Sequence, residues 1–109
     1  MKKALRIKST RDIEAVLKGR DVVRNNHFKV YKRKNHGQRH FRVAFSVPKK
    51  YGNAVERNTM KRRLRMIVSS LNIKNPFDIF IIVNPHAKGI DYETITKEIQ
   101  YLLTKAKII

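Results

Sequence analysis

The chain has 109 residues, of which 26 are Lys or Arg and 8 are Asp or Glu, so its formal net charge at pH 7 is +18. This length favours a single domain over residues 1–109, built around one hydrophobic core. The charge favours a polyanionic partner, because a strongly positive field attracts nucleic acid.

The chain contains no cysteine, which excludes disulfides and thiolate metal sites and suits a reducing cytosol. The basic start is not followed by the apolar run of a signal peptide. No segment approaches the ~20 apolar residues that cross a membrane. We therefore expect a cytoplasmic protein without a membrane partner.

The first predicted element is a helix that Ser9 or Thr10 can cap and that runs to about Lys18. Ser and Thr accept hydrogen bonds from the free amides of a first helical turn, and Gly19 follows as a stop. The apolar side chains have the i, i+3, i+4 spacing of a helix that buries one face, and they are Ile13, Val16 and Leu17.

Two strands are predicted over residues 27–33 and 41–47, where apolar and polar side chains alternate. The polar loop 34–38 separates them, so we predict that they pair as an antiparallel hairpin. In the first strand, Phe28 and Val30 point to one side and Lys29 and Tyr31 to the other.

Three more elements complete the predicted order, which is α-β-β-α-β-α. Asn53 can cap a long helix that reaches about Leu71, and Asp91 can cap a final helix. Between them, residues 77–83 are apolar at nearly every position, as in a central strand buried on both faces. The helix before this strand permits a parallel crossover. We predict an α+β sandwich, with helices packed on a small mixed sheet.

The most informative segment is residues 49–65, in which seven of 17 residues are Lys or Arg and one is acidic. Arg57, Lys61 and Arg65 are four apart and share one helix face, with Asn58 and Arg62 beside them. Like charges at this spacing destabilise a helix by about 0.2–0.5 kcal/mol per pair. A merely solvated face normally mixes charge signs, so the pattern favours a helix covered by a polyanion.

Residues just before this helix could add to the same surface. Gly52 would let the backbone approach a phosphate closely, and a helix N-terminus offers free amides. A single glycine is weak evidence, but Lys49 and Lys50 flank it.

Lys29 and Tyr31 suggest a second surface for nucleic acid. A cation beside an aromatic ring suits single-stranded RNA, whose unpaired bases stack on such rings. Tyr31 could equally cap the edge of the core.

No group of residues points to catalysis by the protein itself. The serines lack the glycine context of a nucleophile elbow, and the eight acids show no paired spacing for metal catalysis. The four histidines lack metal-ligand spacing and fit basic surface loops, at positions His27, His36, His40 and His86. We expect neither a catalytic side chain nor a metal ligand in the protein.

Residues 49–62 resemble the signature of the bacterial ribonuclease P protein component, in which glycine, alanine, valine, arginine and asparagine follow in a fixed order. That order is specific, and a generic basic helix would not supply it. The positions that carry it are Gly52, Ala54, Val55, Arg57 and Asn58. The further basic positions of the motif helix match at Lys61, Arg62 and Arg65. The length, the charge and the predicted element order extend the resemblance over nearly the whole chain.

The resemblance implies a function beyond nucleic-acid binding. Members of this family join a catalytic RNA that holds the catalytic Mg²⁺, and together they remove the 5′ leader from precursor tRNA; no other protein is required. It also implies that the motif helix binds the RNA and that its crossover is left-handed. A cleft between the first helix and the sheet would hold the single-stranded leader, at positions that match Ile13, Leu17, Lys29 and Tyr31. The family often has Phe at the first two positions, so apolar contact would replace stacking here.

Two other classes of protein share the small size and basic charge. A ribosomal-type structural protein would need neither a leader cleft nor the Arg57-Asn58 signature. A DNA architectural protein would bind duplex DNA tightly, with little preference for RNA.

Overall fold

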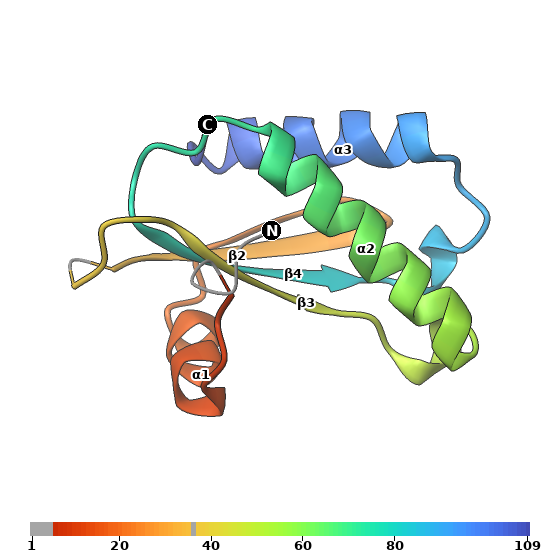
Figure 1. Ribbon diagram of the computed structural model, residues 1–109, viewed down its shortest axis with the longest axis horizontal. Helices are drawn as coiled ribbons and strands as arrows, with labels where there is room; N and C mark the ends of the chain where they lie inside the picture. Colours follow the sequence, from red (N-terminus) through yellow and green to blue (C-terminus); the bar gives the residue numbers. More distant parts are fainter. Residues whose placement is uncertain (1–5, 36) are drawn as a thin grey trace.

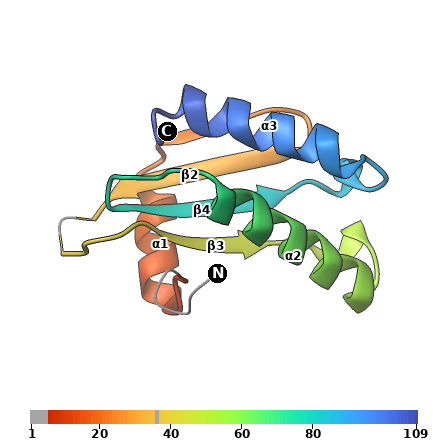
Figure 2. The ribbon, with the colours of Figure 1, turned by 45° about the horizontal axis from the view of Figure 1, so that its top comes forward.

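Over residues 6–35 and 37–109, which the computed structural model describes, the chain forms three α-helices and a four-stranded mixed sheet. His36 lies outside the described residues. Helix α1 covers one face of the sheet, while α2 and α3 lie over the other (Figure 1, Figure 2). The predicted α+β sandwich is therefore confirmed. The elements are α1 (Thr10–Lys18), β1 (Val22–Arg24), β2 (Phe28–Lys34), β3 (Arg42–Ser46), η2 (Lys49–Tyr51), α2 (Ala54–Ser70), β4 (Phe77–Val83), η3 (Pro85–Ala87) and α3 (Tyr92–Lys105).

The strand order is β1-β2-β4-β3, so the predicted hairpin between the two alternating strands is wrong. Strand β4 lies between them, antiparallel to β2 and parallel to β3. The physical reason is that β4 is apolar along almost its whole length, and a central position buries both of its faces. The amide of Asn35 also donates to the carbonyl of Pro76 at 2.8 Å, which joins the end of β2 to the start of β4.

The remaining elements follow the sequence closely. Ser9 caps α1, Asn53 caps α2 and Asp91 caps α3, each accepting a hydrogen bond from the amide three residues later. The helix between β3 and β4 makes the predicted parallel crossover. Strand β1 was not predicted, because three residues are too few to show a period.

The two faces of the sheet differ in how much core they carry. On the α2 and α3 face, Phe28, Val30, Ile79 and Ile81 are fully buried and belong to one large apolar cluster. Fully burying such a side chain stabilises a fold by about 1.5–3 kcal/mol. On the α1 face, Val16 is fully buried, and α1 contributes no other buried side chain among the described residues.

A buried carboxylate holds α1 to the sheet. Asp78 on β4 is 2% exposed and accepts hydrogen bonds from Arg42 Nε at 2.9 Å and Arg42 Nη2 at 2.8 Å. Asn35 Nδ2 donates to the same carboxylate at 3.0 Å. Arg42 Nη1 lies 3.4 Å from Asp12 Oδ2 on α1. A buried charge must be paired, so this network fixes the position of α1.

Candidate nucleic-acid interface

The basic helix α2 begins with two reciprocal hydrogen bonds. The Glu56 amide donates to Asn53 Oδ1 at 2.8 Å, and the Asn53 amide donates to Glu56 Oε1 at 3.0 Å. Lys88 Nζ lies 3.1 Å from Glu56 Oε2. The hydrogen bond from the Asn53 backbone, and then Lys88, lower the pKa of Glu56. The start of α2 is therefore fixed before any partner binds.

Gly52 belongs to this same cap. A Cβ atom at Gly52 would lie 2.6 Å from Glu56 Oε1, a distance that real Cβ contacts do not reach. The absence of a side chain thus allows the Glu56 carboxylate to fold back over the turn. The free amides expected here for a phosphate are partly used by Asn53, so the cap gives a local structural reason for the glycine. A contact between Gly52 and RNA stays a prediction.

Helix α2 has a buried side and a cationic side. Met60, Leu64, Ile67 and Val68 are buried against the core. The predicted RNA-binding positions of α2 lie outside this buried side. Asn58 and Arg62 are exposed, and three further positions are half-buried, namely Arg57, Lys61 and Arg65. Lys49 and Lys50 are exposed on η2, directly before the helix. Helical spacing therefore predicted the cationic side correctly.

Arg57 on this surface and Arg6 beside it each have a buried Nε atom without a hydrogen-bond partner among the described residues. Buried polar atoms are normally hydrogen-bonded, so both Nε groups are left unsatisfied in this structure. Arg65 lies close enough to Arg6 to feel its charge. The pKa of Arg65 is lowered, first by burial and then by the positive charge of Arg6. Sequence reasoning missed Arg6, which stands within a basic segment whose Lys and Arg residues show no helical or strand period.

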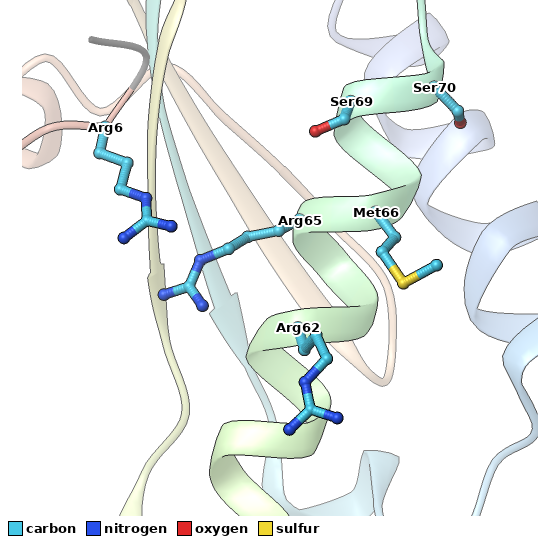
Figure 3. A pocket seen from close by; sticks show the side chains of 6 residues that line it. All are labelled: Arg6, Arg62, Arg65, Met66, Ser69 and Ser70. Atoms are coloured by element: carbon cyan, nitrogen blue, oxygen red, sulfur yellow. The ribbon is translucent and has the colours of Figure 1, made fainter. Parts of the chain in front are cut away.

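Two hollows lie along this side of the molecule. The larger, of about 550 Å³, opens along α2 and is lined by Arg6, Arg62, Arg65, Met66, Ser69 and Ser70 (Figure 3). The smaller, of about 200 Å³, lies beside β3, and Ile13 of α1 and Arg65 of α2 both line it. The α1 face and the cationic side of α2 therefore meet at the β3 edge.

The predicted leader positions all lie on the α1 side of the sheet, although Ile13 and Lys29 line different hollows. Phe28 and Val30 are buried on the opposite face, while Lys29 is exposed and Tyr31 is half-buried. Ile13 and Leu17 of α1 are both half-buried. A hollow of about 180 Å³ at the end of β4 has Lys29 in its wall. The alternation in β2 thus predicted the correct faces.

Within residues 6–35 and 37–109, no three His, Cys, Asp or Glu side chains come together as potential ligands of a metal ion. No helix of that part of the chain is long and apolar enough to cross a membrane.

Comparison with known proteins decides the family. The sequence model of the Ribonuclease P family matches residues 1–107. The chain belongs to the ribonuclease P protein family. It is 43% identical over 111 residues to the ribonuclease P protein component of Acholeplasma laidlawii, an alignment that covers 100% of this chain and 95% of that protein.

Solved structures of the family have the same fold. The RNase P protein of Staphylococcus aureus superposes with a TM-score of 0.89 at 37% identity, over 97% of this chain and 98% of that one. The RNase P protein of Thermotoga maritima gives a TM-score of 0.83 at 29% identity, over 92% of this chain and 96% of that one. The likeness therefore extends along nearly the whole chain.

Family membership settles the kind of function. Ribonuclease P is a metal-dependent, RNA-based endoribonuclease, and this chain is its protein component, a subunit of a ribonucleoprotein with an RNA partner. The ribosomal-type and DNA architectural interpretations are accordingly set aside.

Proposed function

We propose that this chain binds the catalytic RNA through the cationic side of α2 and the 5′ leader of precursor tRNA through the α1 side of the sheet, aiding removal of the leader in the cytoplasm. The RNA would hold the catalytic Mg²⁺ and supply the chemistry. The protein would position RNA, without a catalytic side chain of its own and without a further protein partner.

The observation that carries this proposal is the meeting of the two surfaces at the β3 edge. Ile13, a predicted leader contact, and Arg65, a predicted contact with the catalytic RNA, line one hollow of about 200 Å³. A leader held on the α1 side would therefore lie next to an RNA held along α2. This adjacency supports a protein that presents a substrate segment to its partner RNA.

On α2, the contacts would be made chiefly to phosphates. Arg57, Lys61, Arg62 and Arg65 follow the helix at three- and four-residue spacing, so they can line up along an RNA backbone. A guanidinium group donates two hydrogen bonds in one plane, which suits phosphate oxygens. Asn58 can both donate and accept, as contacts with a base edge or a 2′-hydroxyl require. Lys49 and Lys50 would add charge before the first turn.

On the α1 side, the contacts would be mixed. Lys29 is exposed and can neutralise a leader phosphate, and Tyr31 offers a ring to an unpaired base. Ile13 and Leu17 would supply apolar surface opposite the strand.

The proposal is tested by cleavage of labelled precursor tRNA at low Mg²⁺, with the catalytic RNA alone and with the chain added. A gain in cleavage is expected, and its absence would refute the proposed function.

Paired variants extend this test to α2. Arg62→Ala should weaken assembly with the RNA and reduce the slope of log affinity against log salt by roughly 0.7–0.9 for the lost phosphate contact. Lys105→Ala, at an exposed position of α3, removes the same charge elsewhere and should leave the slope nearly unchanged. Equal effects of the two variants would show that only net charge matters and would contradict the assignment of α2.

A further inference from the structure

Two arginines from distant parts of the sequence point toward each other beside α2 (Figure 3). Arg65 lies on α2. Arg6 precedes α1, and it forms a parallel bridge with Val43 on β3. The Ile7 amide donates to the Val43 carbonyl at 3.1 Å, and the Ile7 side chain is buried. The backbone at residues 6–7 is therefore anchored to the β3 edge, with the Arg6 side chain directed toward α2.

These two positive charges are not neutralised within the described part of the chain. The ion pairs formed there include neither Arg6 nor Arg65. Asp12 and Asp78, acids on neighbouring elements, both pair with Arg42. Two guanidinium groups that face each other repel, and the buried Nε of Arg6 has no acceptor among the described residues. An anion between the two guanidinium groups would remove this repulsion and accept hydrogen bonds from their terminal nitrogens.

A third donor lies on the same side of α2. Ser69 is four residues after Arg65, hence one turn further along the same face, and its side chain points toward Arg6 in Figure 3. Ser70 points away and donates its hydroxyl to the Ile67 carbonyl at 2.7 Å. The hollow is open to solvent, as it must be for a group that belongs to a longer polymer.

We propose that Arg6, Arg65 and Ser69 together hold a single phosphate group of the RNA backbone. The inference rests on the proposed function, because RNA supplies the phosphodiester. It extends that function to the segment before α1 and to a serine outside the basic pattern of the helix. Both arginines would donate to the phosphate oxygens, and the Ser69 hydroxyl would donate a further hydrogen bond.

The shared phosphate has a mechanical consequence. Arg6 is tied to the β3 edge and Arg65 to α2, so a phosphate between them links these two elements from outside. Binding of RNA then also stabilises the segment at residues 6–7 on β3, since a ligand favours the state that it contacts.

The first test uses inorganic phosphate and the nuclear magnetic resonance signals of arginine Nε–H groups. In the full chain, the Arg6 and Arg65 signals should shift together along one saturable curve, while the signal of exposed Arg39 should change little. Arg6→Met, which keeps an apolar stem, should abolish the saturable shift at Arg65, and Ser69→Ala should weaken it. Signals for Arg6 and Arg65 that shift no more than that of Arg39 would overturn the proposal.

The second test uses the catalytic RNA and separates a shared phosphate from two independent contacts. Arg6→Met and Arg65→Met should each reduce the log–log salt slope of RNA binding by about 0.7–0.9, and the double variant should lose no more than either single one. A doubled loss would mean two separate phosphates and would refute the shared site. Binding of inorganic phosphate without any slope change would show a free-anion site instead, which also refutes the proposal.

The two proposals fail in different ways. If the unmodified chain gave no gain in cleavage with the catalytic RNA, the proposed function would fail, while the phosphate titration would still report on the Arg6–Arg65 site. A normal gain in cleavage that Arg6→Met leaves intact, with an unchanged salt slope, would refute only the shared phosphate.

Discussion

Helices α2 and α1 lie on opposite faces of one sheet and are held there by different forces. Helix α2 buries four apolar side chains and starts with a complete cap. Helix α1 buries Val16 alone among its own residues and depends on the charged network of Asp12, Arg42 and Asp78. The comparison teaches that the cations of α2 stand on a rigid apolar support, whereas the position of α1 depends on one buried ionic group.

Removing the Asp78 carboxylate should have the largest effect on the free energy of unfolding. Asp78→Ala leaves Arg42 half-buried without its main partner, and breaking such a pair costs about 3–5 kcal/mol of unfolding free energy. Urea unfolding measures it. Glu93→Ala removes an equally charged group from an exposed pair with Lys97 and should cost less than about 0.5 kcal/mol. Similar losses in the two variants would mean that the Asp78 network does not hold α1.

The next largest effect concerns the α1 side as a binding surface. Tyr31→Ala should weaken binding of precursor tRNA with a long leader by about 1–3 kcal/mol, if its ring stacks on one base. Substrates without a leader should bind as before. Tyr101→Ala, which removes an exposed ring from α3 across the sheet, is the matched control and should affect neither substrate. Equal losses with both substrates would leave Tyr31 as part of the core edge.

Opening the cap of α2 should have a smaller effect on the free energy of unfolding, and it tests how firmly the start of this helix is held. Gly52→Ala places a methyl group against the Glu56 carboxylate, so the reciprocal hydrogen bonds must open, at a cost of about 0.5–2 kcal/mol. In the Glu56→Ala background the carboxylate is absent and only the Cβ of residue 56 remains close, at 3.1 Å, so Gly52→Ala should cost clearly less. Urea unfolding of the four proteins gives both values. An equal cost in both backgrounds would show that the glycine serves another purpose.

Much of both regions could be predicted from the sequence, because local patterns fix local structure. The Asn53 cap follows from the residue type, and the cationic side of α2 and the orientation of Lys29 and Tyr31 follow from the periods of 3.6 and 2. Alternation says which way a side chain points on a strand. It does not say which strand lies beside it, so the pairing of β2 with β4 was missed.

The long-range contacts could not be predicted from the sequence either. Asp78 stands in an apolar run, and only the β3–β4 register places it opposite Arg42. Arg6 approaches Arg65 only because the chain before α1 joins the β3 edge. Both features depend on residues that are far apart in sequence, where a pattern within one window carries no information.

The smallest expected effect is a pH dependence of the free energy of unfolding that arises from Glu56 at the start of α2. The pKa of Glu56 is lowered by the Asn53 backbone hydrogen bond and then by Lys88, so the folded state favours the carboxylate. Its contribution to stability is present above the ordinary value of 4.5 and is lost as pH falls through the lowered folded value. The gap in unfolding free energy between the unmodified chain and Glu56→Gln should therefore be constant near neutral pH.

This gap should close on acidification, because both side chains are then neutral. Urea unfolding between neutral pH and about pH 3 measures it, a range that spans carboxyl titration. Asp91 caps α3 and its pKa is also lowered, chiefly by Thr94, but Asp91 is unchanged in both proteins and cancels from the difference. A gap that stays constant down to the lowest pH would mean that the charge of Glu56 does not stabilise the start of α2. Helix α2 would then be held by its apolar contacts alone.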